Sequence, residues 1–280
     1  MIGVGIIAFN RPNYLRRLIS SLEAQTELDG VDFHLYLDGA FNPISRNIYA
    51  EQKDIDTCAR LWESCKLPNK SLHKRDYNAG IGISCFEATE QLTATYERVM
   101  QMEDDIVLSP HWFRLARILW DELESHPDVY SFNPGFKRVY RKERDTQYAS
   151  NVTYAWNHMW CECFTADRWQ RIRAEYMEYH ALVTGQDYRL FSEYQDGPVQ
   201  ELYFSKRMSP ELARSQDGGR EMAIRLNGMR RALLSVNRAI GIGQHGYHFT
   251  PQKFAEMGFE NQTPFIFADD ATREGFTWDD

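Results

Sequence analysis

Short apolar segments alternate with longer amphipathic segments through the first half of the chain, and this alternation restricts the possible folds more than any other feature. The apolar segments read as buried strands, and they lie at residues 2–8, 31–37, 71–75, 98–102 and 129–132. The segments between them repeat apolar residues at helical spacing, and they lie at residues 11–22, 45–65, 82–96 and 110–125. Such alternation predicts an α/β fold, a mostly parallel sheet covered by helices on both faces.

The second half of the chain is less regular. Its expected elements are a loop or hairpin at 137–151, an aromatic segment at 154–169, helices at 166–180 and 186–194, and a last strand at 233–242. The sequence Ser-Gln-Asp-Gly-Gly at residues 215–219 is expected to form a flexible break. No linker or repeat divides the sequence, so we expect one domain over residues 1–280, with halves at 1–135 and 136–250 and a C-terminal tail at 251–280.

The charge and hydrophobicity of the chain exclude some classes of protein. A net charge of −8 argues against nucleic acid as a partner. No apolar run reaches the roughly 18 residues needed to span a bilayer, and the first apolar segment lacks the basic start of a signal peptide. We therefore expect a cytoplasmic protein without a transmembrane segment. Basic clusters at 16–17, 137–144 and 230–231 leave open a peripheral contact with the inner face of a membrane, although solvated helix surfaces explain them at least as well.

Polar segments follow four of the predicted strands, at the point where each strand ends. They are Asn10-Arg11, Asp38-Gly39, residues 75–82 and residues 103–105. Ligands of open α/β sheets bind at the carboxyl ends of parallel strands. These four segments are therefore expected to converge on one edge of the sheet.

The last of these segments contains three consecutive acids, Glu103, Asp104 and Asp105. Adjacent carboxylates repel one another, and the end of a buried strand is a costly place to leave them unpaired. A hard divalent cation relieves this repulsion, and Mg²⁺ or Mn²⁺ often shares its coordination with substrate phosphates. A solvated acidic turn is the alternative. We favour a site for Mn²⁺ or Mg²⁺ that binds a diphosphate.

Several of these motifs together resemble the nucleotide-sugar glycosyltransferases of GT-A fold, particularly relatives of N-acetylglucosaminyltransferase I and bacterial polysaccharide glycosyltransferases. The resemblance covers residues 2–250 and is strongest in the first half. The matching segments are residues 6–12, 36–39, 77–82, 103–113, 160–169, 217 and 236–248. The resemblance implies a GT-A-type Rossmann-like sheet, with residues 1–135 binding the nucleotide sugar and 136–250 binding the acceptor.

The resemblance also implies an activity. The implied reaction is a metal-dependent, inverting transfer of a hexosyl or N-acetylhexosaminyl group. The donor is a nucleotide-diphosphate sugar, with UDP the expected nucleotide, and the acceptor is a glycan or lipid-linked saccharide in polysaccharide biosynthesis. Two other functions stay open, a nucleotidyltransferase acting on sugar phosphates and a non-catalytic sugar-binding domain of the same fold. The sequence Asn10-Arg11-Pro12 after the first strand is unlike the Gly-rich phosphate loop of the former, and the intact acids argue against the latter.

The residues of the donor site follow from this resemblance. Asp105 is expected to bind the metal directly, because it projects furthest past the strand end, and His248 or else His245 to approach the metal or the diphosphate. Contacts with the donor are expected from Arg11, Asp38, Arg75, Gly80, Glu103, Asp104 and Trp160. Surface positions, turn formation and core packing are the alternatives for several of them, and Trp156 is a second candidate for stacking on a sugar.

Inverting transfer needs a base that takes the proton from the acceptor hydroxyl. Asp217 is the first candidate, because it lies where the resemblance places the catalytic base. Glu162 is the second, because an aromatic neighbourhood could raise the pKa of its carboxyl. Asp187 and Glu221 are weaker candidates.

Overall fold

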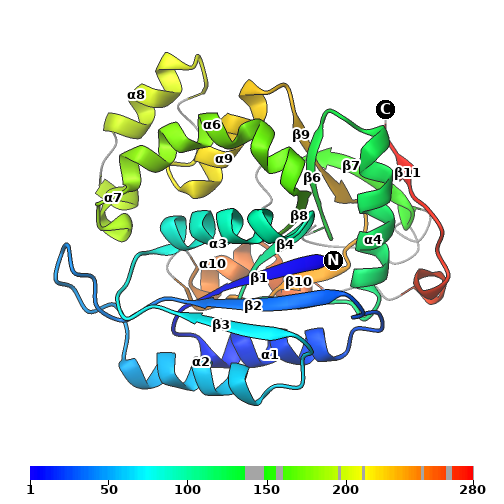
Figure 1. Cartoon of the computed structure of the whole chain (residues 1–280), viewed down its shortest axis with the longest axis horizontal. Coiled ribbons are helices and arrows are strands. Elements are labelled where there is room, and N and C mark those ends of the chain that lie inside the picture. The colour runs from blue at the N-terminus through cyan, green and yellow to red at the C-terminus, as the bar shows by residue number, and fades with distance from the viewer. Residues whose placement is uncertain are drawn as a thin grey trace.

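A computed structural model describes residues 1–135, 148–155, 160–194, 197–209, 212–246, 249–262 and 267–279. Its centre is a nine-stranded sheet with the strand order β11-β7-β9-β6-β8-β4-β1-β2-β3 (Figure 1). Five of the eight neighbouring strand pairs are parallel, and helices pack against both faces. The predicted α/β class and mostly parallel sheet are therefore confirmed.

The first half of the chain supplies a continuous parallel sheet. Its strands are β1 (Ile2–Ala8), β2 (Val31–Leu37), β3 (Lys70–Lys74) and β4 (Arg98–Glu103). Ile2 of the first strand is in register with Val31 on one side and Arg98 on the other. The carboxyl ends of these strands therefore meet at one edge, as the sequence predicted.

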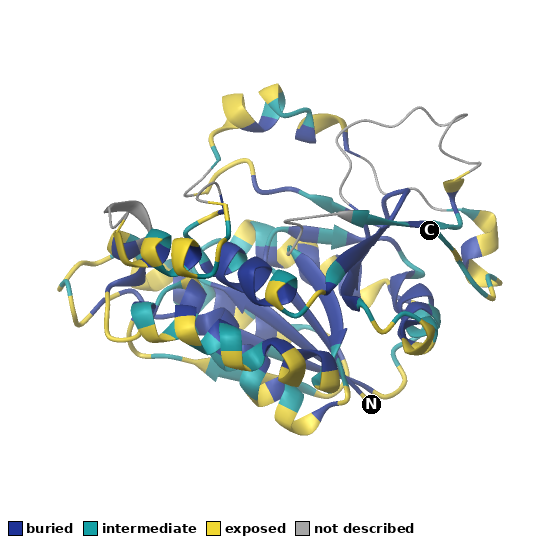
Figure 2. Cartoon of the chain, turned by 90° about the horizontal axis from the view of Figure 1, so that it is seen from above, coloured by how far each residue is buried: buried dark blue, intermediate teal, exposed yellow. Residues whose placement is uncertain are grey.

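Two hydrophobic layers sandwich this sheet. One layer contains α1 (Pro12–Glu23), α2 (Gln52–Ser64) and α4 (Trp112–Glu122). The other contains α3 (Ile81–Thr95), α6 (Ala166–Val183), α7 (Tyr188–Tyr194), α8 (Gly197–Ser205) and α9 (Gln216–Leu226). Consecutive strand residues face opposite layers, so Ile6 packs in the first and Ile7 in the second. Figure 2 shows the strands buried between helices whose outer faces are exposed.

The second half of the chain adds strands of both directions to the same sheet. Strand β8 (Cys161–Thr165) inserts antiparallel between β4 and β6 (Val129–Asn133). Strand β9 (Arg230–Leu234) pairs parallel with β6, and β7 (Asn151–Ala155) pairs antiparallel with β9. Among the described helices, none has the length and apolarity to cross a membrane.

Three sequence-based expectations are corrected. The predicted strand at 233–242 is two strands, since β9 ends at Leu234 and β10 (Ala239–Gly241) pairs instead with β5 (Ile106–Leu108). The helix predicted from residue 45 begins at Gln52. The break predicted at 215–219 is the start of α9. The expected C-terminal tail at 251–280 contains α10 (Pro251–Glu256) and the edge strand β11 (Thr277–Trp278), and its Asp270 pairs with Arg238.

Candidate active site

A cavity of about 1040 Å³ lies at the carboxyl ends of β1, β2 and β4. The segment after β10, the start of α9 and the C-terminal helix α10 form its other walls. This is where an open α/β sheet is expected to bind its ligand, and the volume suits a ligand larger than a single sugar. Of the residues predicted for the site, those that line the cavity are Arg11, Asp38, Gly80, Glu103, Asp104, Asp105, Trp160, Asp217 and His245.

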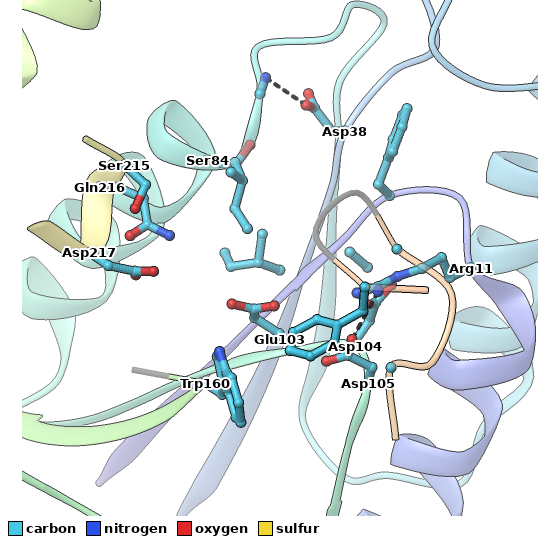
Figure 3. A pocket seen from close by; sticks show the side chains of 18 of the residues that line it. Arg11, Asp38, Ser84, Glu103, Asp104, Asp105, Trp160, Ser215, Gln216 and Asp217 are labelled. Atoms are coloured by element: carbon cyan, nitrogen blue, oxygen red, sulfur yellow. Dashed lines mark hydrogen bonds and ion pairs between the residues drawn. The ribbon is translucent and has the colours of Figure 1, made fainter. Parts of the chain in front are cut away.

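The three consecutive acids lie at the floor of this cavity, at the end of β4 (Figure 3). Arg11, from the turn after β1, pairs with Asp104 and places its Nη1 2.8 Å from Asp105 Oδ2. Burial raises the pKa of Asp104 to about 6, a rise that Arg11 opposes and Asp105 supports. Burial, Asp105 and Asp217 raise the pKa of Glu103 well above its ordinary value. The floor therefore holds more negative charge than Arg11 alone balances.

The acids fit a divalent cation only if that cation shares its coordination with a ligand. Their carboxylate oxygens are hard donors, and Asp104 Oδ2 is buried without a hydrogen-bond partner in the described part of the chain. Within the same residues, no three His, Cys, Asp or Glu side chains are arranged to bind one ion. Mg²⁺ commonly takes one or two carboxylates and fills its shell with phosphate oxygens and water. The acids suit that kind of site rather than a closed protein cage.

Asp38 has a structural role that the sequence left open. Its two carboxylate oxygens accept hydrogen bonds from the backbone N–H groups of Ala79, at 2.9 Å, and Gly80, at 2.8 Å. Arg75 lies behind this turn, 3.6 Å from Asp38, where it donates to Ser84 and pairs with Glu87. Asp38 thus shapes the cavity wall, and Arg75 supports it without lining the cavity.

Gly80, which was expected to contact the donor, lines the cavity and has a side chain of α7 as its neighbour. Its φ is +84°, and a Cβ there would lie 2.6 Å from Tyr188 Cβ. A Cβ at Gly82 would lie 2.1 Å from the Tyr188 ring. These glycines make room for Tyr188, which lines the cavity and which sequence reasoning missed, because no sequence signal marks a tyrosine as the partner of distant glycines.

Asp217 projects into the cavity from the first turn of α9, on the side facing Glu103 (Figure 3). Gly218 and Gly219 were expected to form a flexible break, yet both are helical, and the space beside each is filled. A Cβ would lie 1.6 Å from the Ala213 carbonyl oxygen at Gly218 and 2.4 Å from the Tyr179 ring at Gly219. Burial raises the pKa of Asp217, which brings it closer to the range of a general base.

The Gly218→Ala substitution is expected to destabilise the protein by about 1–3 kcal/mol, because the added methyl group overlaps a backbone carbonyl that cannot rotate away. Alanine gains up to about 1 kcal/mol of helix propensity, which does not offset this overlap. Gly197→Ala is the matched control, since Gly197 begins α8 with nothing within 4 Å of its Cβ position. Urea denaturation measures both, and equal midpoints for the two variants would contradict this account of α9.

Glu162 lies outside the cavity, so it is withdrawn as a candidate base. It is 1% exposed, and its carboxylate pairs with Arg220 at 2.9 Å and Arg231 at 2.6 Å. Burial alone would raise its pKa, but the two arginines hold that pKa below its ordinary value. A carboxylate so stabilised is a poor proton acceptor.

The two weaker candidates for the base are also engaged elsewhere. Glu221 is fully buried and pairs with Arg231 and Arg225. Asp187 accepts a 2.6 Å hydrogen bond from the Tyr49 hydroxyl. Neither lines the cavity, which leaves Asp217 as the candidate base at the site.

Aromatic side chains form one wall of the cavity. Trp160 packs against Phe259 at a ring distance of 5.4 Å, and Phe249 and Phe254 continue the wall. Sequence reasoning missed these phenylalanines, two of which lie in the C-terminal tail at 251–280. His245 is exposed at the cavity rim, whereas His248 and Trp156 lie outside the described residues.

The chain thus has an α/β fold of GT-A type, with an acidic cavity at the carboxyl ends of its parallel strands. Among solved structures, the chain is similar to S. aureus TarS 1-349 in complex with UDP-GlcNAc, with a TM-score of 0.52 and 12% identity over 91% of this chain and 64% of that one. The chain thus spans less than two thirds of that TarS fragment. At this identity the likeness establishes the fold alone.

Other comparisons are weaker. The 4-diphosphocytidyl-2C-methyl-D-erythritol synthase from Anaerococcus prevotii DSM 20548 matches with a TM-score of 0.43 and 12% identity, over 92% of this chain and 94% of that one. That score is too low to support the nucleotidyltransferase alternative. No protein-family model and no curated protein matches the sequence.

Proposed function

We propose that this protein is a glycosyltransferase that moves a hexosyl or N-acetylhexosaminyl group from a UDP-sugar to a glycan or lipid-linked saccharide. The observation that carries the proposal is the meeting of the acids at 103–105 with Asp217 across one cavity, in a fold shared with a protein crystallised with UDP-GlcNAc. A role in polysaccharide biosynthesis, at the cytoplasmic face of a membrane, is part of the proposal.

The floor of the cavity binds the donor diphosphate in this proposal. Asp105 is the residue that would hold Mn²⁺ or Mg²⁺, with Asp104 beside it and Arg11 as a second positive group. A cation bound there would neutralise the charge that develops on the departing diphosphate. Glu103 and Asp104 contact the sugar and ribose, and the turn shaped by Asp38 and Gly80 lies beside the nucleoside.

Asp217 is the general base. The acceptor hydroxyl loses its proton to the Asp217 carboxylate as its oxygen attacks C1 of the donor sugar, and the bond from C1 to the diphosphate oxygen breaks. Attack on the face opposite the leaving group inverts the configuration at C1. Trp160 offers its ring to a sugar face, as aromatic rings commonly do in saccharide sites.

Metal-dependent binding of UDP tests the donor site. UDP is expected to bind at least tenfold more tightly by calorimetry with Mn²⁺ than in EDTA, because the cation relieves the repulsion between the acids and the diphosphate. Asp105→Asn should remove most of this gain, whereas Asp187→Asn, the same change outside the cavity, should keep it. Equal affinity in Mn²⁺ and EDTA would overturn the metal assignment, and absence of UDP binding in both would overturn the proposed function.

A further inference from the structure

A second cavity of about 10 Å³ lies directly behind Asp217. Its polar lining comes from Gln101, Glu103, Gln216, Asp217 and Arg220. This volume is close to the minimum that admits one water molecule, and a buried water needs two to four polar partners. The cavity provides both the space and the polar lining for one water.

Two side chains that line this cavity each have a polar atom left over. Gln216 Oε1 and Arg220 Nε are buried, and neither has a hydrogen-bond partner among the residues that the structure describes. The other nitrogens of Arg220 are engaged, since Nη1 donates to Glu162 at 2.9 Å and Nη2 donates to Thr89 at 3.0 Å. Buried polar atoms without partners are rare, so two of them at one small cavity point to a bound water.

The chemistry of the two atoms is complementary. A guanidinium Nε–H can only donate, and an amide oxygen can only accept. One water would accept from Arg220 Nε and donate to Gln216 Oε1, leaving its second O–H for a carboxylate of the lining. That pair of hydrogen bonds fixes which way the Gln216 amide points.

The orientation of this amide matters because Gln216 and Asp217 line the same small cavity, where the Gln216 side chain acts to lower the pKa of the Asp217 carboxyl. With Oε1 turned to the water, the amide NH₂ faces the carboxylate and donates to it. In the opposite orientation, the amide oxygen would face the carboxylate and repel it. The backbone of Gln216 is held in place by a 2.7 Å hydrogen bond from its N–H to the Tyr188 hydroxyl.

We propose that Gln216 is a positioning residue for Asp217, and that an ordered water between Gln216 Oε1 and Arg220 Nε sets its orientation. The inference rests on the proposed function, in which Asp217 is the base. The inference also gives the buried Arg220 a role at the active site. Arg220 does not touch the site directly but acts on it through the water and the Gln216 amide.

Other groups also act on the charge of Asp217, and the test must separate them from Gln216. Burial raises the pKa of Asp217, while Arg231, Arg220 and the Gln216 hydrogen bond lower it. The other titratable groups that face it are Glu103, Glu162, Cys85, Tyr176, Tyr188 and Tyr203. Gln216 can be made apolar without changing the charge of this set.

The test is the pH dependence of kcat/KM for Gln216→Met, which keeps the side-chain length but removes the donor. The charged form of Asp217 loses a hydrogen bond, so its pKa should rise and the acidic limb of the profile should move up by about one pH unit. At pH values below the acidic limbs of both wild type and variant, kcat/KM of the variant should be about tenfold lower than that of wild type. UDP affinity should be unchanged, because the diphosphate contacts lie elsewhere.

Gln25→Met is the matched control, since Gln25 is also buried but bonds Ser21 and Ser109 on the opposite layer. It should lower Tm without moving the pH profile. If Gln216→Met does not fold, Gln216→Glu should move the limb in the same direction by adding a carboxylate beside Asp217. An unmoved limb in the folded variant would overturn the inference, and so would a high-resolution crystal structure without a water between Gln216 and Arg220.

The failure of the inference and that of the proposed function can be told apart. If Asp217→Asn abolishes turnover while the profile of Gln216→Met matches wild type, Asp217 remains the base and only the positioning role is wrong. If Asp217→Asn keeps turnover, the base assignment itself is wrong and the inference falls with it.

Discussion

The Asp217→Asn variant is expected to lose roughly 10²–10⁴-fold in kcat, because an amide cannot accept the proton of the acceptor hydroxyl. Asparagine keeps the size of the side chain and its place at the start of α9. The affinity for UDP should stay within about twofold of wild type, since the proposed diphosphate contacts are at the end of β4 and not on α9. Initial rates at saturating donor and acceptor, with calorimetry for UDP, measure the two quantities.

Asp187→Asn is the control for this substitution, because Asp187 is the same residue type outside the cavity. It removes one acceptor of the Tyr49 hydroxyl and should leave kcat near wild type. Near-normal turnover of Asp217→Asn would mean that another group takes the proton, and the role of α9 in the reaction would have to be abandoned.

The Glu162→Gln variant is expected to lose about 3–5 kcal/mol of stability, because it leaves a buried arginine without its counter-charge. Arg231 would keep Glu221 as a partner, whereas Arg220 has no other acidic partner among its described hydrogen bonds. The expected fall in Tm is roughly 10 °C. The control is Glu178→Gln, which breaks the half-exposed pair with Lys206 and should change stability by less than about 1 kcal/mol.

This loss should depend on pH in a definite direction. The arginines hold the pKa of Glu162 below its ordinary value, so its ion pairs stabilise the folded state at pH values above the unfolded pKa of about 4.3. Their contribution disappears as the pH falls through the lower, folded pKa. The difference in Tm between wild type and Glu162→Gln should therefore be constant at neutral pH and shrink in acid. A difference that grows in acid would contradict the pairing.

The sequence predicted the first half of the fold because its signals are local. Strand Ile2–Ala8 is a continuous apolar run, and Val31–Leu37 places apolar residues on either side of Asp32 and His34. Patterns of this kind at the core of a parallel sheet need no information about their partners. The signal failed where a distant residue decides the conformation. Gly218 and Gly219 lie in α9, where Ala213 and Tyr179 leave no space for a Cβ, and Arg238, which follows β9, pairs with the distant Asp270.

The predictions for the site divide in the same way, into those that depend on local signals and those that depend on distant residues. The cluster at the carboxyl edge could be predicted, since the ends of parallel strands meet by geometry, and Arg11, Asp38 and Glu103 do line one cavity. The role of Glu162 could not be predicted, because aromatic residues surround it in the sequence while its partners, Arg220 and Arg231, lie 58 and 69 residues further along the chain. Whether a carboxylate is poised for chemistry or locked in an ion pair is a property of its spatial neighbours, which the sequence does not display.

The insertion of β8 between β4 and β6 has a consequence for how the molecule holds together. Strands β4 and β6 both belong to residues 1–135, yet each pairs with β8 from the second half of the chain. A cut between the halves would expose two sheet edges inside what is now a continuous sheet, and exposed edges recruit other chains. The strand ends that line the cavity and the helix α9 that carries Asp217 are therefore parts of one cooperative unit, in which we expect that neither half unfolds or can be exchanged alone.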